Sequence, residues 1–188
     1  MVSGDHVKRD ESTIKLPRAL LTLAIILAAV FGLSFLLRTF VYQAYAIPSG
    51  SMETTIEVGD YVFAEKVSYY FSEPEVGDIV TFADPADATR TLIKRVVAVG
   101  GQTVRLVDGK VYVDGEPLDE PYANGKPSYP FTTSSVRFPY TVPEGYIWVM
   151  GDNRTNSQDS RYFGAIPLES VTGKAVWTIW PIDRFGAL

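Results

Sequence analysis

An uncharged apolar stretch near the N-terminus constrains this chain more than any other feature. Between Arg18 and Arg38, the 19 residues from Ala19 to Leu37 carry no charge. As an α-helix rising about 1.5 Å per residue, they span roughly 28 Å, close to the thickness of a bilayer's hydrocarbon core. A buried core helix is the alternative, but a domain of this size rarely hides so many apolar residues on every side. We therefore expect a transmembrane helix over residues 19–37, preceded by a tail of residues 1–18.

A cleaved secretory signal is a second alternative for the same region. The segment Ala44-Tyr45-Ala46 has the form of a processing site. However, the apolar stretch is longer than the usual run of about 7–15 residues in such a signal, which favours a retained anchor.

The basic residues around the helix predict its orientation. Four of them precede it, and Arg38 alone follows it before Lys66; the four are Lys8, Arg9, Lys15 and Arg18. An excess of Lys and Arg marks the cytoplasmic side of a membrane. We expect a single-pass protein of the cytoplasmic membrane, with a cytoplasmic N-terminus and a body of residues 42–188 on the outer side.

The composition removes several kinds of chemistry from that body. The chain has no cysteine, and its one histidine is His6, upstream of the helix. Disulfides, thiolate zinc sites and cysteine nucleophiles are thereby excluded, as are a Ser-His-Asp triad or a histidine metal site in the body. The net charge of −5 makes nucleic acid a poor partner.

The pattern of the body predicts β structure. Short runs rich in β-branched and aromatic residues alternate with Gly, Pro and Asp. They cover residues 61–67, 77–82, 91–99, 103–107, 110–113, 145–150 and 173–180. Asp108-Gly109 is typical of a tight hairpin turn. Six prolines between Pro117 and Pro143 exclude a central strand or helix there, so we expect a mainly antiparallel β domain with a smaller inserted β subdomain at about residues 100–145.

Two short segments contain a candidate nucleophile and a candidate base. In Pro48-Ser49-Gly50-Ser51-Met52, a serine can act as nucleophile only if a base removes its proton; an ordinary turn is the alternative. Strand alternation places Lys94 on one face with Leu92 and Val96. Burial on that face would lower its pKa and make the neutral amine available as a general base. A solvated edge-strand lysine is the alternative.

The third segment is GDNRTNSQDSR at residues 151–161. Ten of its eleven residues could form side-chain hydrogen bonds, so it folds compactly only if they satisfy one another. A calcium-binding EF-hand is excluded, because Arg154 and Ser157 stand where an oxygen ligand and a glycine are needed. A plain polar loop is the alternative.

Four motifs behind one anchor resemble those of the type I signal peptidases, the membrane-bound leader peptidases that remove signal peptides from exported preproteins. In order they are PSGSM at residues 48–52, GDIVTF at 77–82, IKRVV at 93–97 and GDNRTNSQDSR at 151–161. The resemblance extends from the helix to the C-terminus. It implies a mostly β serine endopeptidase without metal or cofactor, whose preprotein substrates carry small residues at positions −1 and −3.

The resemblance also implies roles for individual residues. Ser51 would be the nucleophile and Lys94 its general base. Ser49 would lend its hydroxyl to an oxyanion hole beside the Ser51 backbone N–H, and Ser157 would orient Lys94 by a hydrogen bond. Structural support would come from Asp152, Asp159 and Arg161.

Other interpretations remain open at this point. One is a non-catalytic, membrane-tethered β module, such as an assembly factor derived from the same family. Another is a Ser/Lys self-cleaving regulator with a related core. The aromatic clusters Tyr69-Tyr70-Phe71 and 177–180 are predicted either to contact the lipid bilayer or, for Trp177 and Trp180, to pack in the core.

Overall fold

The computed structural model describes residues 18–188, which divide into an N-terminal unit ending at Leu37 and a second unit, Arg38–Leu188. Except for Arg18, the expected cytoplasmic tail lies outside the described residues.

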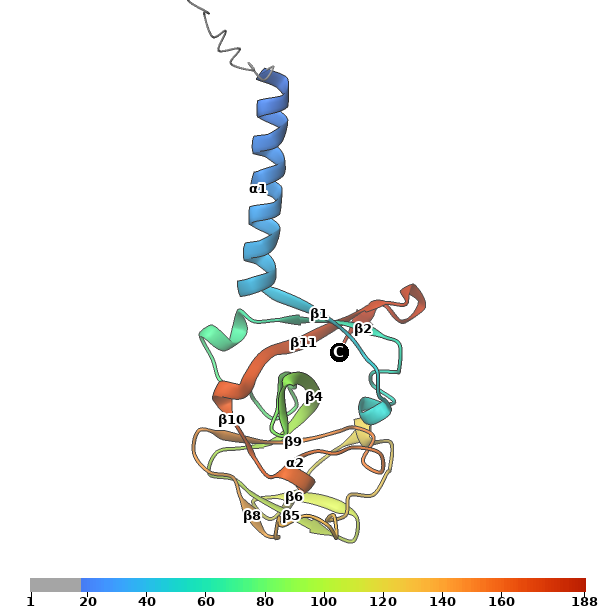
Figure 1. The fold of residues 1–188 in the computed structure, drawn as a ribbon. Coiled ribbons are helices and arrows are strands. Elements are labelled where there is room, and N and C mark those ends of the chain that lie inside the picture. The colour runs from blue at the N-terminus through green and yellow to red at the C-terminus, as the bar shows by residue number, and fades with distance from the viewer. Residues whose placement is uncertain (1–17) are drawn as a thin grey trace, which may run out of the picture. The chain divides into compact units, whose positions relative to one another are not determined.

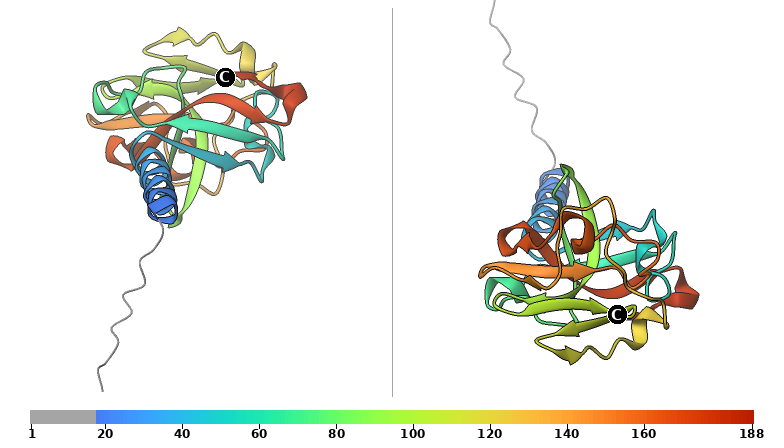
Figure 2. Two further views of the ribbon diagram at one scale, coloured as in Figure 1. Left: turned by 90° about the horizontal axis from the view of Figure 1, so that it is seen from above. Right: turned by 90° about the horizontal axis from the view of Figure 1, so that it is seen from below.

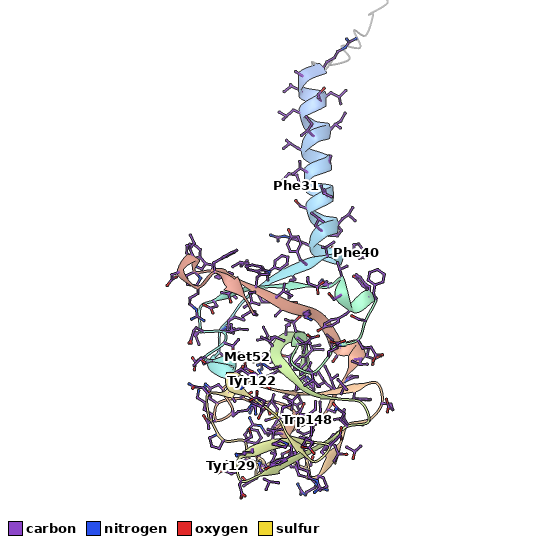
Figure 3. The ribbon with its side chains drawn as sticks, turned by 180° about the vertical axis from the view of Figure 1, so that it is seen from behind. Phe31, Phe40, Met52, Tyr122, Tyr129 and Trp148 are labelled. Carbon is purple, nitrogen blue, oxygen red and sulfur yellow. The ribbon has the colours of Figure 1, made fainter. Side chains whose placement is uncertain are left out.

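The apolar stretch forms one continuous helix. Helix α1, Arg18–Phe40, has 23 residues and none of its side chains is buried. It is long and apolar enough to cross a membrane. It extends the expected span by one residue at its start and three at its end. Phe31, labelled in Figure 3, is 73% exposed, as expected of a side chain that faces lipid.

An eight-stranded sheet forms the main part of the second unit (Figure 1). Its path runs β1-β2-β11-β3-β4-β9-β10, with β12 paired to β11, and every pairing is antiparallel. The strands are β1 (Tyr42–Ala46), β2 (Tyr61–Glu65), β3 (Ile79–Asp84), β4 (Asp87–Val99), β9 (Tyr146–Met150), β10 (Ile166–Pro167), β11 (Val171–Trp180) and β12 (Gly186–Ala187). The predicted mainly antiparallel β fold is confirmed.

A second, four-stranded sheet lies on the side of the body opposite β1 and β2, as the views in Figures 1 and 2 show. It has the order β7-β6-β5-β8. Its strands are β5 (Thr103–Val107), β6 (Lys110–Val113), β7 (Glu116–Pro117) and β8 (Tyr140–Thr141). Asp108 and Gly109 both have positive φ, 50° and 77°, which is the backbone of the predicted hairpin turn. The boundaries of an inserted subdomain at about residues 100–145 stay a prediction.

Helical structure in the second unit is short. The one α-helix wholly inside the described part of this unit is α2, Ser160–Phe163. Five 3-10 turns complete the fold: η1 (Gly50–Met52), η2 (Ser68–Tyr70), η3 (Pro121–Ala123), η4 (Leu168–Ser170) and η5 (Ile182–Arg184).

The two sheets share a hydrophobic core around Trp148. This side chain is fully buried and packs with Val104 and Val111 of the second sheet and with Val97 and Met150 of the first. Figure 3 shows Trp148 in the middle of the body. The other tryptophans differ: Trp177 and Trp180 are 42% and 53% exposed, so the expectation that they pack in the core is wrong.

Strand β1 is integrated into the main sheet. All five of its residues pair with β2, and the rings of Tyr42 and Phe63 stack with their centroids 5.1 Å apart. Cleavage after Ala46 would remove this strand and expose the edge of β2. The structure therefore favours the retained anchor over the cleaved signal.

Candidate active site

Two buried apolar side chains hold the turn that carries Ser51. Ile47 and Met52, on either side of this turn, both belong to one core cluster with residues of β2, β3 and β11. Gly50 lies so close to Glu53 that a β-carbon there would stand 2.5 Å from its carboxylate. The turn is thus anchored on both sides, and Ser51 in η1 is only 9% exposed.

Lys94 reaches Ser51 from the middle of β4. Its side chain is 3% exposed, on the face that strand alternation predicts, with the buried Val96 two residues on. Lys94 Nζ lies 2.7 Å from Ser51 Oγ, in hydrogen-bond contact. It also donates to the backbone carbonyl of Ile93 at 2.8 Å. The candidate nucleophile and base are therefore in direct contact across 43 residues of sequence.

The surroundings of Lys94 favour its neutral form. Burial lowers the pKa of Lys94 from 10.5 to about 8, because a charged ammonium loses its hydration there. The carboxylates of Asp159, Asp152 and Asp84 act in the opposite direction and favour the charged form. Desolvation dominates, so a neutral fraction is available near physiological pH.

The polar segment 151–161 satisfies its side chains only partly from within: Asp159 and Arg161 pair with each other, whereas Asp152, Asn153 and Arg154 find partners outside the segment. Arg161 donates to both carboxylate oxygens of Asp159, at 2.8 Å each, and to the carbonyl of Arg154 at 2.8 Å. Asp159 also accepts from the backbone N–H of Gly151 at 3.1 Å and caps α2. Asp159 and Arg161 thus close the loop on itself.

Asp152 links this loop to β4. It is fully buried and accepts two hydrogen bonds from the Arg95 guanidinium, at 2.9 and 2.7 Å, and a third from the Thr55 hydroxyl. The Arg95 guanidinium also lies over the ring of Tyr122, 4.1 Å from its centroid. Sequence reasoning missed Arg95, whose position next to Lys94 in β4 puts it on the opposite face of the strand.

Ser157 does not form the expected hydrogen bond with Lys94. Its hydroxyl is buried and has no hydrogen-bond partner among the described residues. It lies so close to Gly151 that a β-carbon on this glycine would overlap Ser157 Oγ. The Lys94 amine is instead engaged by Ser51 and the Ile93 carbonyl.

Two cavities meet at the Ser51–Lys94 pair. One, of about 280 Å³, runs along the end of β1 and the first half of β4; the other, of about 310 Å³, extends toward α2. Both are lined by Ser49, which is exposed. Within residues 18–188, no group of three or more Asp, Glu, His or Cys side chains could hold a metal ion. Ser51 and Lys94 line both cavities, so the pair is reached from both.

Comparisons with known proteins point to one family. Residues 18–180 match the family model described as signal peptidase, peptidase S26. The chain is 43% identical over 170 residues to a probable signal peptidase I-1 of Synechocystis sp., covering 87% of this chain and 84% of that one. It is 40% identical to a signal peptidase I of Leptolyngbya laminosa, covering 84% and 80%. A crystal structure of a signal peptidase I from Enterococcus faecalis is 34% identical, covers 55% and 97%, and has a TM-score of 0.48.

Proposed function

This chain belongs to the signal peptidase family, peptidase S26, and we propose that it works through a dyad of Ser51 and Lys94. Its function is that of a signal peptidase I, a membrane-anchored serine-type peptidase acting on preproteins with signal peptides. The observation that most directly supports a catalytic dyad is the 2.7 Å hydrogen bond between Lys94 Nζ and Ser51 Oγ. A non-catalytic module would not explain why the Lys94 side chain is buried.

In the first step, neutral Lys94 takes the proton of Ser51 Oγ as this oxygen attacks the carbonyl carbon of the scissile bond. The resulting ammonium then gives its proton to the departing amine, and the C–N bond breaks. The mature protein leaves with a new N-terminus, and the signal peptide remains as an ester on Ser51. Lys94 is neutral again at the end of this step.

In the second step, Lys94 removes a proton from a water molecule that attacks the ester. The signal peptide leaves as a carboxylic acid, and Ser51 regains its proton. Small residues at positions −1 and −3 of the substrate would lie in the cavity beside β1 and β4. Its lining includes Ile47, Leu92 and Ile93, which present apolar surface to such side chains.

The oxyanion hole is proposed to consist of the Ser51 backbone N–H and the Ser49 hydroxyl. Negative charge develops on the scissile carbonyl oxygen during attack, and donors aimed at that position lower the barrier. Ser49 lines both cavities, and its backbone is extended, with φ −137° and ψ 150°. Its exposed position on the lining of both cavities supports this role.

Four residues of the 151–161 loop are proposed to support the dyad. Asp152, Asp159 and Arg161 hold the loop through buried ion pairs. Ser157 is proposed to turn its unpaired hydroxyl toward Lys94 when the amine releases Ser51 during catalysis. Support for this role is its burial beside Gly151, next to the nucleophile.

The division and topology of the chain are proposed from the sequence. Residues 1–18 would be cytoplasmic, residues 19–37 would span the cytoplasmic membrane, and residues 42–188 would form the catalytic domain on its outer side. Within that domain, residues 100–145 would form the smaller subdomain. The excess of basic residues before the helix supports this orientation.

The dyad is tested by incubating the purified full-length protein in detergent with a labelled preprotein. We expect the wild type to release the signal peptide and Ser51→Ala to release none. Ser135→Ala, which changes an exposed serine in the loop before β8, is the matched control and should cleave normally. Cleavage by a folded Ser51→Ala protein would contradict the dyad, and an inactive wild type would favour the non-catalytic module.

A further inference from the structure

Asn153 brackets Ser51 with two hydrogen bonds. Its side-chain NH₂ donates to the carbonyl oxygen of Gly50 at 2.8 Å, and its backbone N–H donates to the carbonyl oxygen of Ser51 at 3.1 Å. The same NH₂ reaches a carboxylate oxygen of Glu53 at 3.0 Å. Asn153 itself is 4% exposed, so little of its side chain is in contact with water. One residue thus holds the peptide groups on both sides of the nucleophile.

The bond to Gly50 fixes the direction of the Ser51 N–H. In a trans peptide the carbonyl and the N–H of one plane point in opposite directions. Holding the Gly50 carbonyl toward Asn153 therefore turns the Ser51 N–H away from Asn153. A rotation of this plane would move the N–H from the position where an oxyanion forms.

Lys126 determines which way the Asn153 amide faces. Lys126 Nζ donates to Asn153 Oδ1 at 2.8 Å. An ammonium can only donate, whereas the Gly50 carbonyl and the Glu53 carboxylate can only accept. A flipped amide would set its oxygen against two acceptors and its NH₂ against the ammonium. Lys126 thereby selects the orientation in which Asn153 holds the Gly50 carbonyl.

We propose that Asn153, oriented by Lys126, is a positioning residue that aims the oxyanion-binding N–H of Ser51. The inference rests on the proposed function, since it needs Ser51 to be the nucleophile. Lys126 lies beyond η3, in the segment between β7 and β8 of the second sheet. That segment therefore contributes to catalysis by setting the nucleophile turn, without touching the substrate.

The test compares four variants in the full-length protein. Removing an oxyanion donor outright costs about 10²–10³ in kcat, so misaiming one through Asn153→Ala should cost on the order of 10-fold to 100-fold. Lys126→Met should lose on the order of 10-fold, and Lys126→Arg, which keeps a donor, should recover most of this loss. Lys110→Met changes an exposed lysine of β6 and is the matched control. It should match the wild type.

A peptide aldehyde with alanine at position −1 separates positioning from general stability. Ser51 Oγ adds to the carbonyl carbon of the aldehyde, whose oxygen then occupies the oxyanion position. The inhibition constant should rise in step with the loss of kcat/KM in the Asn153 and Lys126 variants, while KM changes little. If these residues had only a structural role, the substitutions would lower the melting temperature without a matching rise in the inhibition constant.

Two results would overturn the inference. Wild-type kcat in folded Lys126→Met would do so, even if Asn153→Ala fails to fold. Unchanged aldehyde inhibition in variants that have lost kcat would also do so. If the wild type neither cleaves preprotein nor binds the aldehyde, the proposed function fails together with this inference.

Discussion

The α-carbon of Gly151 lies so close to Ser51 that a β-carbon on it would overlap the Ser51 carbonyl oxygen. The obstacle is backbone, which cannot turn aside as a flexible side chain can. We predict that Gly151→Ala displaces the nucleophile turn and lowers preprotein cleavage by roughly 10²-fold, as misplacements near 1 Å do. The assay is steady-state cleavage, with circular dichroism to confirm the fold.

Gly186→Ala is the control for this substitution. Gly186 lies in β12, and a β-carbon added to it would have nothing within 4 Å. It should keep wild-type cleavage and stability. Full activity in Gly151→Ala would show that the two loops can separate without disturbing the dyad.

The unpaired hydroxyl of Ser157 predicts opposite effects on stability and activity. A buried hydroxyl without a partner costs about 1–3 kcal/mol, so Ser157→Ala should leave the melting temperature unchanged or raise it. If the hydroxyl turns to Lys94 during catalysis, the same substitution should lower kcat by about 10-fold or more, but by less than the roughly 10²–10⁴-fold that the proton-transferring group itself contributes. Thermal unfolding and cleavage are measured on one preparation. Unchanged kcat would remove Ser157 from the mechanism.

Local sequence patterns predicted much of this fold. Strand alternation around Lys94 placed its side chain on a buried face, and Asp108-Gly109 marked a hairpin turn that the backbone contains. Helix α1 continues to Phe40, beyond the apolar stretch, because Arg38 and Thr39 interrupt hydrophobicity but not helical geometry.

Contacts between distant segments could not be predicted in the same way. The Ser51–Lys94 bond depends on the order of strands in the main sheet, which brings the turn after β1 over β4; residue spacing does not encode this. No sequence pattern predicts the hydrogen bond from Lys126 to Asn153 either, because a lysine in a proline-rich segment is typical of a solvated loop. The hydrogen bond expected between Ser157 and Lys94 is absent, because the partner of a hydroxyl depends on distances that no motif specifies.

The buried pair of Arg95 and Asp152 predicts a large effect on stability. Asp152 is fully buried and both oxygens accept from Arg95. Arg95→Met should destabilise the fold by about 3–5 kcal/mol, because it leaves a buried carboxylate without its cation. Adding Asp152→Asn should recover much of this loss, since the remaining group is neutral. Urea unfolding of both proteins measures the difference in the free energy of unfolding. If the two substitutions lower this free energy additively, Arg95 and Asp152 are not coupled.

The charge distribution around α1 predicts its topology. In intact cells with the wall or outer membrane opened, added protease should digest residues 42–188 while the cytoplasmic membrane is still closed. Substituting Lys8, Arg9 and Lys15 by Gln should weaken this orientation, because Lys and Arg near the helix set its direction. Lys66→Gln, beyond the helix, serves as the control. A body protected until the membrane is lysed would mean the opposite orientation.

The lowered pKa of Lys94 predicts the pH dependence of cleavage. Only the neutral amine can take the Ser51 proton, and the pKa of Lys94 is about 8. The neutral fraction therefore rises as the pH increases through 8, and falls about tenfold for each unit below it. We expect kcat/KM to rise along an acidic limb with a midpoint near 8 and to level off above it. A limb near 6 or near 10 would indicate another group or a solvated lysine.

Lys94→Arg tests the same residue without removing its charge. A guanidinium stays protonated throughout the accessible pH range and cannot accept the serine proton. The variant should therefore be as inactive as Lys94→Ala at every pH, and raising the pH should not rescue it. Lys110→Arg, the same exchange at an exposed lysine of β6, is the matched control and should retain the acidic limb. Near-wild-type cleavage by a natively folded Lys94→Arg protein would show that the general base lies elsewhere.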